Sequence, residues 1–178
     1  MATVASSTSI TDRMIGALRL DVLTYEEVEA DKKATGEAAF IVVASALVAA
    51  AGYALQVGGT VNEGLLGAIA ELIGWGLFAL CAYIVGGKLI PGPNTKTSWG
   101  EIARTLGYAH TPRFLLILLA VPGIFGLVRF VVSLWILAAT VVALRSALDC
   151  GTVRAVIVAV LASIVQLIVV ALIVGLVS

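Results

Sequence analysis

The stretch FLLILLAVPGIFGLVRFVVSLWILAATVVAL, residues 114–144, decides the fold of this chain. It contains a single charge, Arg129, and as one straight helix it would extend roughly 46 Å. A helix needs only about 20 apolar residues to cross the hydrocarbon core of a bilayer, so one crossing cannot use this length. Pro122 and Gly123 interrupt the stretch, and proline removes a backbone donor and disfavours helix in the residue before it. We therefore predict a tight turn here, with a membrane span on either side.

The composition of the whole chain is that of a membrane protein. Of its 178 residues, 61% are hydrophobic and 12% are charged, which is far more apolar than a soluble domain of this size. The formal net charge is zero, which gives no reason to expect nucleic acid as a partner. The first ten residues lack the basic start and apolar stretch of a signal peptide, so we expect the mature chain to begin near Met1. Cys81 and Cys150 have no neighbour at metal-ligand or redox spacing, and we expect both to be free thiols.

Five apolar runs are long enough to cross a membrane. We predict an all-α polytopic membrane helix bundle with five transmembrane helices, at about 38–57, 65–85, 103–121, 124–144 and 153–177, the third kinked at Pro112. Residues 37–178 then form the membrane domain, and residues 1–36 a short amphipathic segment in the cytoplasm. The alternative has four spans and treats residues 114–144 as one long helix.

The basic residues give the expected orientation. Ten of the eleven Lys and Arg residues lie in three clusters, at every second connection between the apolar runs: Arg13, Arg19, Lys32 and Lys33; Lys88, Lys96, Arg104 and Arg113; Arg145 and Arg154. Short loops rich in positive charge mark the cytoplasmic side of a membrane protein. Five spans put all three clusters in the cytoplasm and the C-terminus on the opposite side, whereas four spans move Arg145 and Arg154 outside. The charge bias thus favours five spans.

The N-terminal segment has the spacing of short amphipathic helices. Ser9 followed by Asp12, and Thr24 followed by Glu27, have the form of helix-starting capping pairs, so we expect two helices joined near residues 23–24. The second helix carries four carboxylates between Glu26 and Asp31, which favour either solvent or a basic partner surface. A solvated connecting helix is the simpler interpretation.

Glu71 and Arg129 are ionisable residues inside the second and fourth predicted spans, where charge is costly and often functional. Glu71 lies roughly 10 Å inside the outer end of the second span, and Arg129 roughly 8 Å inside the outer end of the fourth. Because their depths match and a facing opposite charge lowers the cost of burial, we predict an intramembrane ion pair between Glu71 and Arg129. Such a pair fixes helix packing; an ion or proton pathway is the alternative, although one carboxylate makes a poor relay.

The segment 99–113 is the most polar and aromatic stretch near a predicted membrane face. One interpretation is an interfacial belt, with aromatic rings at the headgroups and arginines extending their charges to them. The other is a docking site for a partner protein or lipid, formed by Trp99, Arg104, Gly107, Tyr108, His110, Pro112 and Arg113. Glycine allows close backbone approach and proline frees a carbonyl group for a partner, which favours docking.

Signatures of catalysis are missing from the sequence. It has no nucleophile elbow, no HExxH motif and no phosphate-binding glycine-rich loop, and a lone histidine, His110, forms neither a metal site nor a catalytic dyad. We therefore predict no catalytic residues, no metal ligands and no cofactor, and a protein that is not an enzyme.

At several residues the chain resembles the Yip-domain family, the Ypt/Rab-interacting membrane proteins. They are Trp99, the run Arg104-Thr105-Leu106-Gly107-Tyr108-Ala109, Pro112, Pro122, Trp135 and Arg145, with Thr24-Tyr25-Glu26-Glu27-Val28 before the first span as in short bacterial members. The resemblance covers nearly the whole chain and implies a five-span fold, no enzymatic activity and a place in the cytoplasmic (inner) membrane of a bacterium. Eukaryotic members are associated with Golgi and endoplasmic reticulum traffic and with prenylated Rab GTPases. This chain lacks their long cytosolic N-terminal region and its Asp-Leu-Tyr-Gly-Pro type motif, so the resemblance does not extend to a GTPase partner.

The function expected from the sequence is therefore structural. The leading hypothesis is a non-enzymatic integral membrane protein that binds other membrane proteins, or organises membrane lipids, through its cytoplasmic face and helices. A second hypothesis is an accessory subunit of a larger, for instance bioenergetic, membrane complex. A third, a small transporter or channel, rests on Glu71, Arg129 and the proline-broken helices, but an odd number of spans without a visible repeat argues against it.

Overall fold

The computed structural model describes residues 9–177, the side chains of 173, 174, 176 and 177 excepted, and these residues form helices without any strand. Expectations that concern residues 1–8 and residue 178 lie outside this range. The helices are α1 (Ile10–Leu18), α2 (Val22–Ala30), α3 (Ala34–Val57), α4 (Val61–Ala82), α5 (Trp99–Tyr108), α6 (Phe125–Ala147) and α7 (Thr152–Val177), with a π-helical segment η1 (Tyr83–Leu89) and a 3₁₀ segment η2 (Thr111–Ala120).

Four helices are long and apolar enough to cross a membrane, and they correspond to four of the predicted spans. They cover Ala34–Val57, Val61–Leu89, Phe125–Ala147 and Thr152–Leu172, and only 22–33% of each apolar window is buried inside the protein. The exposed side chains on them are largely aliphatic or aromatic, among them Phe40, Ile69, Phe130 and Leu134. An apolar surface of this extent is stable in lipid and not in water, so the chain is a membrane protein.

The third predicted span is a composite rather than a kinked α-helix. The α-helix stops at Tyr108, and the chain continues from Thr111 as a 3₁₀ segment with Pro112 in its first turn. Proline lacks the backbone donor that an uninterrupted α-helix would need at this position. Since a 3₁₀ segment rises about 2 Å per residue, η2 is about as long as a 13-residue α-helix. It lies along α3 and packs against α3 more extensively than any other pair of elements in the described chain.

The turns follow the expected chemistry with one exception. Gly58 ends α3 with φ of 83°, and Gly123 has φ of 86° in the turn after Pro122, both in the left-handed region that glycine adopts freely. The Ser9 side chain caps α1 by accepting from the Asp12 amide, as predicted. The prediction for α2 was wrong, because the helix starts at Val22 with Asp21 as its cap and Thr24 lies inside it.

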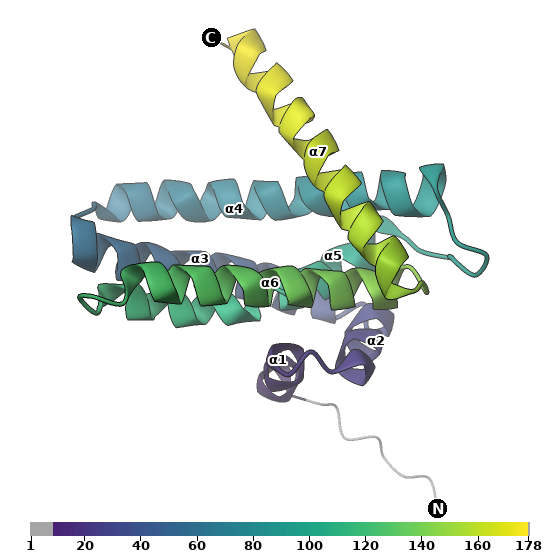
Figure 1. Cartoon of the computed structure of the whole chain (residues 1–178), viewed down its shortest axis with the longest axis horizontal. Helices are drawn as coiled ribbons and strands as arrows, with labels where there is room; N and C mark the ends of the chain where they lie inside the picture. The colour runs from purple at the N-terminus through teal and green to yellow at the C-terminus, as the bar shows by residue number, and fades with distance from the viewer. Residues whose placement is uncertain (1–8, 178) are drawn as a thin grey trace, which may run out of the picture.

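The long helices α3, α4 and α6 and the composite of α5 and η2 lie side by side and alternate in direction, whereas α1 and α2 lie at an angle to them and α7 leaves the bundle (Figure 1). The short connections 58–60 and 121–124 lie at one end of the bundle, and the longer connection 90–98 and the start of α7 lie at the other. Helices α1 and α2 pack near this second end, against α5, α6 and η2. The first part of α7 packs on α4 and α6, while its C-terminal half projects away from the bundle.

Candidate functional site

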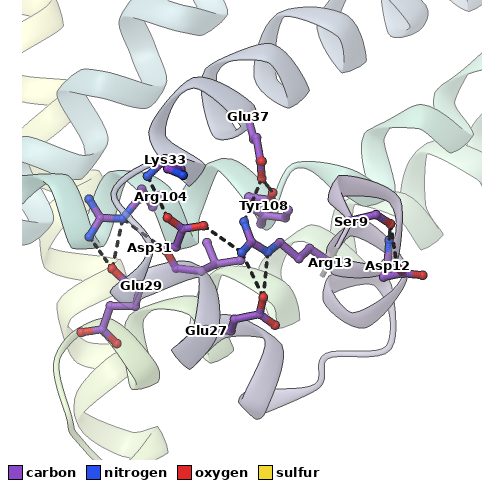
Figure 2. Close-up of polar contacts among 11 residues, drawn as sticks. Ser9, Asp12, Arg13, Glu27, Glu29, Asp31, Lys33, Glu37, Arg104 and Tyr108 are labelled. Atoms are coloured by element: carbon purple, nitrogen blue, oxygen red, sulfur yellow. Dashed lines mark hydrogen bonds and ion pairs between the residues drawn. The ribbon is translucent and has the colours of Figure 1, made fainter. Parts of the chain in front are cut away.

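Two groups of charged side chains lie inside this apolar protein. The first, which we call the N-terminal clamp, joins α1 and α2 to the rest of the chain and consists of Arg13, Glu27, Asp31, Glu37 and Tyr108 (Figure 2). The second, which we call the Glu71 cluster, lies between the long helices and consists of Glu71, His110 and Arg113. A charged side chain that is removed from water is costly unless an opposite charge or a hydrogen bond compensates, so the charged residues of both groups depend on one another for their positions.

Arg13 is the centre of the N-terminal clamp. Its side chain is on the buried face of α1 and the residue is 5% exposed. Its guanidinium donates from Nε to Glu27 Oε1 at 3.0 Å, from Nη2 to Asp31 Oδ2 at 2.8 Å and from Nη1 to Glu37 Oε2 at 3.1 Å. The Tyr108 hydroxyl donates to the same Glu37 oxygen. Arg13 thus joins α1 to α2 and α3, because the planar guanidinium fork offers several donors, and Tyr108 adds α5 to the clamp through Glu37.

The charges of the clamp stabilise one another. Burial acts to lower the pKa of Arg13, but the hydrogen bonds that it donates to Asp31 and Glu27 outweigh this effect and leave that pKa above its usual value. The hydrogen bond from Arg13, with that from the Lys33 amide, holds the pKa of Asp31 below its usual value. Arg13 and Asp31 therefore stay ionised at neutral pH.

Arg104 attaches α2 to α5 by a different contact. The residue is 6% exposed, and its Nε donates to the carbonyl oxygens of Val28 at 3.2 Å and Glu29 at 3.1 Å. These carbonyls lie in the last turn of α2. The last carbonyl groups of a helix have no hydrogen-bond donor within the helix and carry partial negative charge. Trp135 does the same for α1, donating from Nε1 to the Leu18 carbonyl at 3.0 Å. Both N-terminal helices are thus held at their C-terminal ends.

The predicted docking segment 99–113 contacts the protein's own helices. Arg104, Gly107, Tyr108 and Pro112 are buried. A Cβ atom on Gly107 would lie 2.5 Å from Ala38 Cβ, so the glycine is needed for the contact between α5 and α3. Trp99 is 41% exposed, and its Nε1 donates to the Gly76 carbonyl at 3.2 Å. Much of the segment therefore packs inside the protein, and its role in docking a partner or lipid stays a prediction.

The Glu71 cluster replaces the ion pair expected from the sequence. Glu71 Oε1 is 2.6 Å from Arg113 Nη1 and 3.3 Å from His110 Nε2, while His110 Nδ1 is 2.8 Å from the Leu106 carbonyl oxygen. The predicted partner, Arg129, makes no ion pair with any residue from 9 to 177. The prediction did not consider Arg113, which lies within the third helical stretch, residues 99–120, and whose guanidinium reaches Glu71 from there.

Arg129 nevertheless lies near Glu71, on the wall of the same cavity. This cavity of about 550 Å³ is bounded by residues of α3, α4, η2 and α6, and its polar lining includes Tyr53, Glu71, Arg113, Arg129 and Ser133. A second cavity of about 450 Å³ continues from it past Glu71 and Arg113 toward α7, where Thr140 and Gln166 line it. The structure thus brings together Glu71, His110, Arg113 and Arg129, but pairs them differently from the prediction.

Sequence reasoning missed the N-terminal clamp, although one signal pointed to it. The acidic run from Glu26 to Asp31 favoured a basic partner surface, and that surface is Arg13 in the preceding helix. Arg13 and Ala17 lie one turn apart on the buried face of α1, a placement that the pattern of apolar residues alone does not reveal.

The fold and its charged clusters define a polytopic helical membrane protein with N-terminal helices docked on the bundle. The chain belongs to the Yip1 domain family: the family model described as Yip1 domain matches residues 20–174, from just after α1 to near the end of α7. Comparison with curated proteins and with solved structures gives no match.

Proposed function

We propose that this Yip1-family chain is a non-enzymatic protein of the bacterial cytoplasmic membrane that binds another membrane protein through the C-terminal half of α7. The observation that carries the proposal is the exposure of this half-helix. Gln166 makes the last polar contact of α7 with the bundle, donating to the Gly74 carbonyl at 2.9 Å. Beyond it, Leu167, Ile168, Val170 and Leu172 are 69%, 54%, 43% and 62% exposed.

These residues cover more than one face of the helix, so between Leu167 and Leu172 only Val169 is partly buried, and the ribbon of α7 leaves the bundle here (Figure 1). A helix in a membrane bundle gains van der Waals contacts and buried polar bonds from its neighbours, and the first half of α7 has both. The outer half has neither within the described chain. A partner helix would supply them, which is the reason for preferring a binding role.

The proposal includes five crossings with the N-terminus in the cytoplasm. In support, α5 spans about 15 Å and η2 about 20 Å, and together they match the thickness of the hydrocarbon core. Lys88, Lys96, Arg145 and Arg154 lie at or near the ends of the neighbouring spans and then belong to the cytoplasmic side by the positive-inside rule. With the opposite orientation, the turn 121–124 would lie in the cytoplasm instead.

Labelling of single cysteines tests the topology. In a background without Cys81 and Cys150, Val121→Cys should react with a membrane-impermeant maleimide added to intact spheroplasts. The matched variant Asn94→Cys, in the 90–98 connection, should react only after permeabilisation. Protection of Val121→Cys in intact spheroplasts, with labelling of Asn94→Cys, would refute the proposed orientation.

Photocrosslinking in native membranes tests the binding role. A photoreactive phenylalanine analogue at Leu167 or Leu172 should give one discrete crosslinked protein band. The matched control carries the analogue at Leu134, which is 51% exposed on α6, and should give lipid adducts only. Lipid adducts alone at all three positions would refute the binding role, and a band of twice the chain's own mass would assign α7 to self-association instead.

A further inference from the structure

The two cavities beside Glu71 form one continuous groove, because both are lined by Gly67, Glu71, Arg113 and Ile136. We call it the α4–α6 groove. Gly67 and Glu71 belong to α4 and Ile136 to α6, so two apolar helices long enough to cross a membrane form its walls. The larger part, of about 550 Å³, has the volume of a site for a small organic group, for which roughly 300–1,000 Å³ is usual.

The charges that line the larger part do not balance. Arg113 and Arg129 are cationic and Glu71 is anionic, which leaves one positive charge in excess. Glu71 is already bonded to Arg113, whereas Arg129 has no acidic partner among residues 9–177 and Arg113 Nε is buried without an acceptor. An uncompensated arginine at membrane depth is costly, and a bound anion lowers that cost.

The position of Arg129 indicates how an anion would reach it. Arg129 lies four residues after Phe125, about 6 Å along α6 from its start at the end of the bundle that holds the connections 58–60 and 121–124. It is exposed, and the hydroxyl-bearing residues Tyr53 and Ser133 line the same part of the groove. The site is therefore just below the headgroup region of one leaflet and offers additional hydrogen-bonding groups.

The rest of the lining selects the kind of anion. Leu116, Phe125 and Val132 line the groove beside the charged groups, and Leu127 and Phe130 next to Arg129 are exposed and apolar. A freely soluble anion would gain nothing from these surfaces, whereas a lipid would place its acyl chains against them. A guanidinium also matches the oxygens of a phosphate in geometry.

We propose that the α4–α6 groove is a binding site for an anionic phospholipid, with the phosphodiester bound by Arg129 and assisted by Arg113. Glu71 is a positioning residue that holds the Arg113 side chain in the groove. The net positive charge of the lining selects an anionic lipid over a zwitterionic one. This site is independent of the partner proposed for α7.

Native mass spectrometry of the delipidated, detergent-purified chain tests the proposal. The probes are phosphatidylglycerol and phosphatidylcholine with identical acyl chains, and glycerol phosphate as the soluble anion. The first phosphatidylglycerol should bind about tenfold more tightly to the wild type than to R129Q, the effect of losing one charge-assisted contact. The matched control R19Q removes one exposed arginine from the N-terminal segment and should bind like the wild type.

A melting measurement keeps folding and binding apart. Phosphatidylglycerol should raise the melting temperature of the wild type and of R19Q, and should leave that of R129Q unchanged, while all three melt at the same temperature without lipid. Equal weakening of binding in R129Q and R19Q would overturn the proposal, because general charge attraction then explains the binding. Equal affinity for the two lipids, or binding of glycerol phosphate as tight as that of phosphatidylglycerol, would overturn it as well.

Discussion

Replacement of Arg13 by glutamine should release α1 and α2 from the bundle without unfolding the long helices. Arg13 is 5% exposed and donates to three carboxylates on two other helices. Glutamine has two donors on one nitrogen and no charge, so it cannot bridge these acceptors. Glu27, Asp31 and Glu37 would then lie close together with no cation among them, and the mutual repulsion of their charges would favour separation of the helices.

The magnitude follows from the geometry. A hydrogen bond to a charged group contributes roughly 1.5–3 kcal/mol, and loss of one partner of a buried pair costs about 3–5 kcal/mol. The three carboxylate side chains are 39%, 30% and 31% exposed, so water replaces part of the lost interaction. We therefore expect a loss of about 3 kcal/mol in the free energy that holds the N-terminal helices in place.

Hydrogen exchange measures this loss directly. Local opening sets the exchange rates of amides in α1 and α2, so a loss of about 3 kcal/mol should accelerate them roughly a hundredfold. Amides of α3 and α6 should keep their rates. Arg19→Gln is the matched control, since Arg19 is exposed and makes no ion pair within residues 9–177. Unchanged rates in α1 and α2 of the Arg13 variant would refute the reasoning, because the clamp would then contribute nothing to docking.

Three further substitutions test other contacts. Gly52→Ala should destabilise the protein by about 1–3 kcal/mol in reversible denaturation, because its Cβ would lie 2.2 Å from the Leu116 carbonyl oxygen. The control Gly36→Ala, in the same helix, has nothing within 4 Å of its Cβ and should be neutral or stabilising. Equal effects of the two substitutions would contradict the contact between α3 and η2. In double-mutant cycles, the interaction free energy between Glu71→Gln and Arg113→Gln should be about 1–3 kcal/mol, and that between Glu71→Gln and Arg129→Gln less than about 0.5 kcal/mol. A larger interaction free energy with Arg129 than with Arg113 would support the pair predicted from the sequence. Burial, with the nearby charges of Asp149 and Glu101, raises the pKa of Glu29 from 4.5 to about 7. The folded state therefore holds this proton more strongly than the unfolded state, and the stability of the wild type falls as the pH rises from about 4.5 to 7. Glu29 is partly exposed, so we expect Glu29→Gln to gain about 1 kcal/mol over the wild type between pH 5 and pH 8 in chemical denaturation, and a constant difference would contradict the shift.

Helix positions were predictable from the sequence because lipid requires long apolar runs and glycine and proline punctuate them. The turn at Pro122 and Gly123, the end of α3 at Gly58 and the cap at Ser9 are all local effects, and each is found as predicted. The change from α-helix to 3₁₀ segment near Pro112 was predicted only as a kink. Its form depends on the close packing of η2 against Gly52 and the rest of α3, which no local pattern encodes.

Partners of charged residues were harder to predict, because they depend on where helices lie relative to one another. Matching depths along two helices correctly placed Glu71 and Arg129 at one cavity, yet Arg113 was assigned to the membrane surface and so was not considered. For Arg13 the sequence offered four acidic residues nearby and no means of choosing among solvent, a separate partner and the preceding helix. The fold selects the helix, since α1 packs against α2 and leaves Arg13 buried.

The family match covers the acceptors of the N-terminal clamp but not its donor Arg13. Its acceptors Glu27, Asp31 and Glu37 lie within residues 20–174, whereas Arg13 on α1 precedes them. Arg104 holds α2 from within the matched range, so α2 keeps its place on α5 by contacts of its own. Helix α1 therefore contributes a cation to an acidic surface that the matched range already presents. Because these three carboxylates share one cation, the strength of the Arg13 contacts decides how exposed this acidic surface becomes.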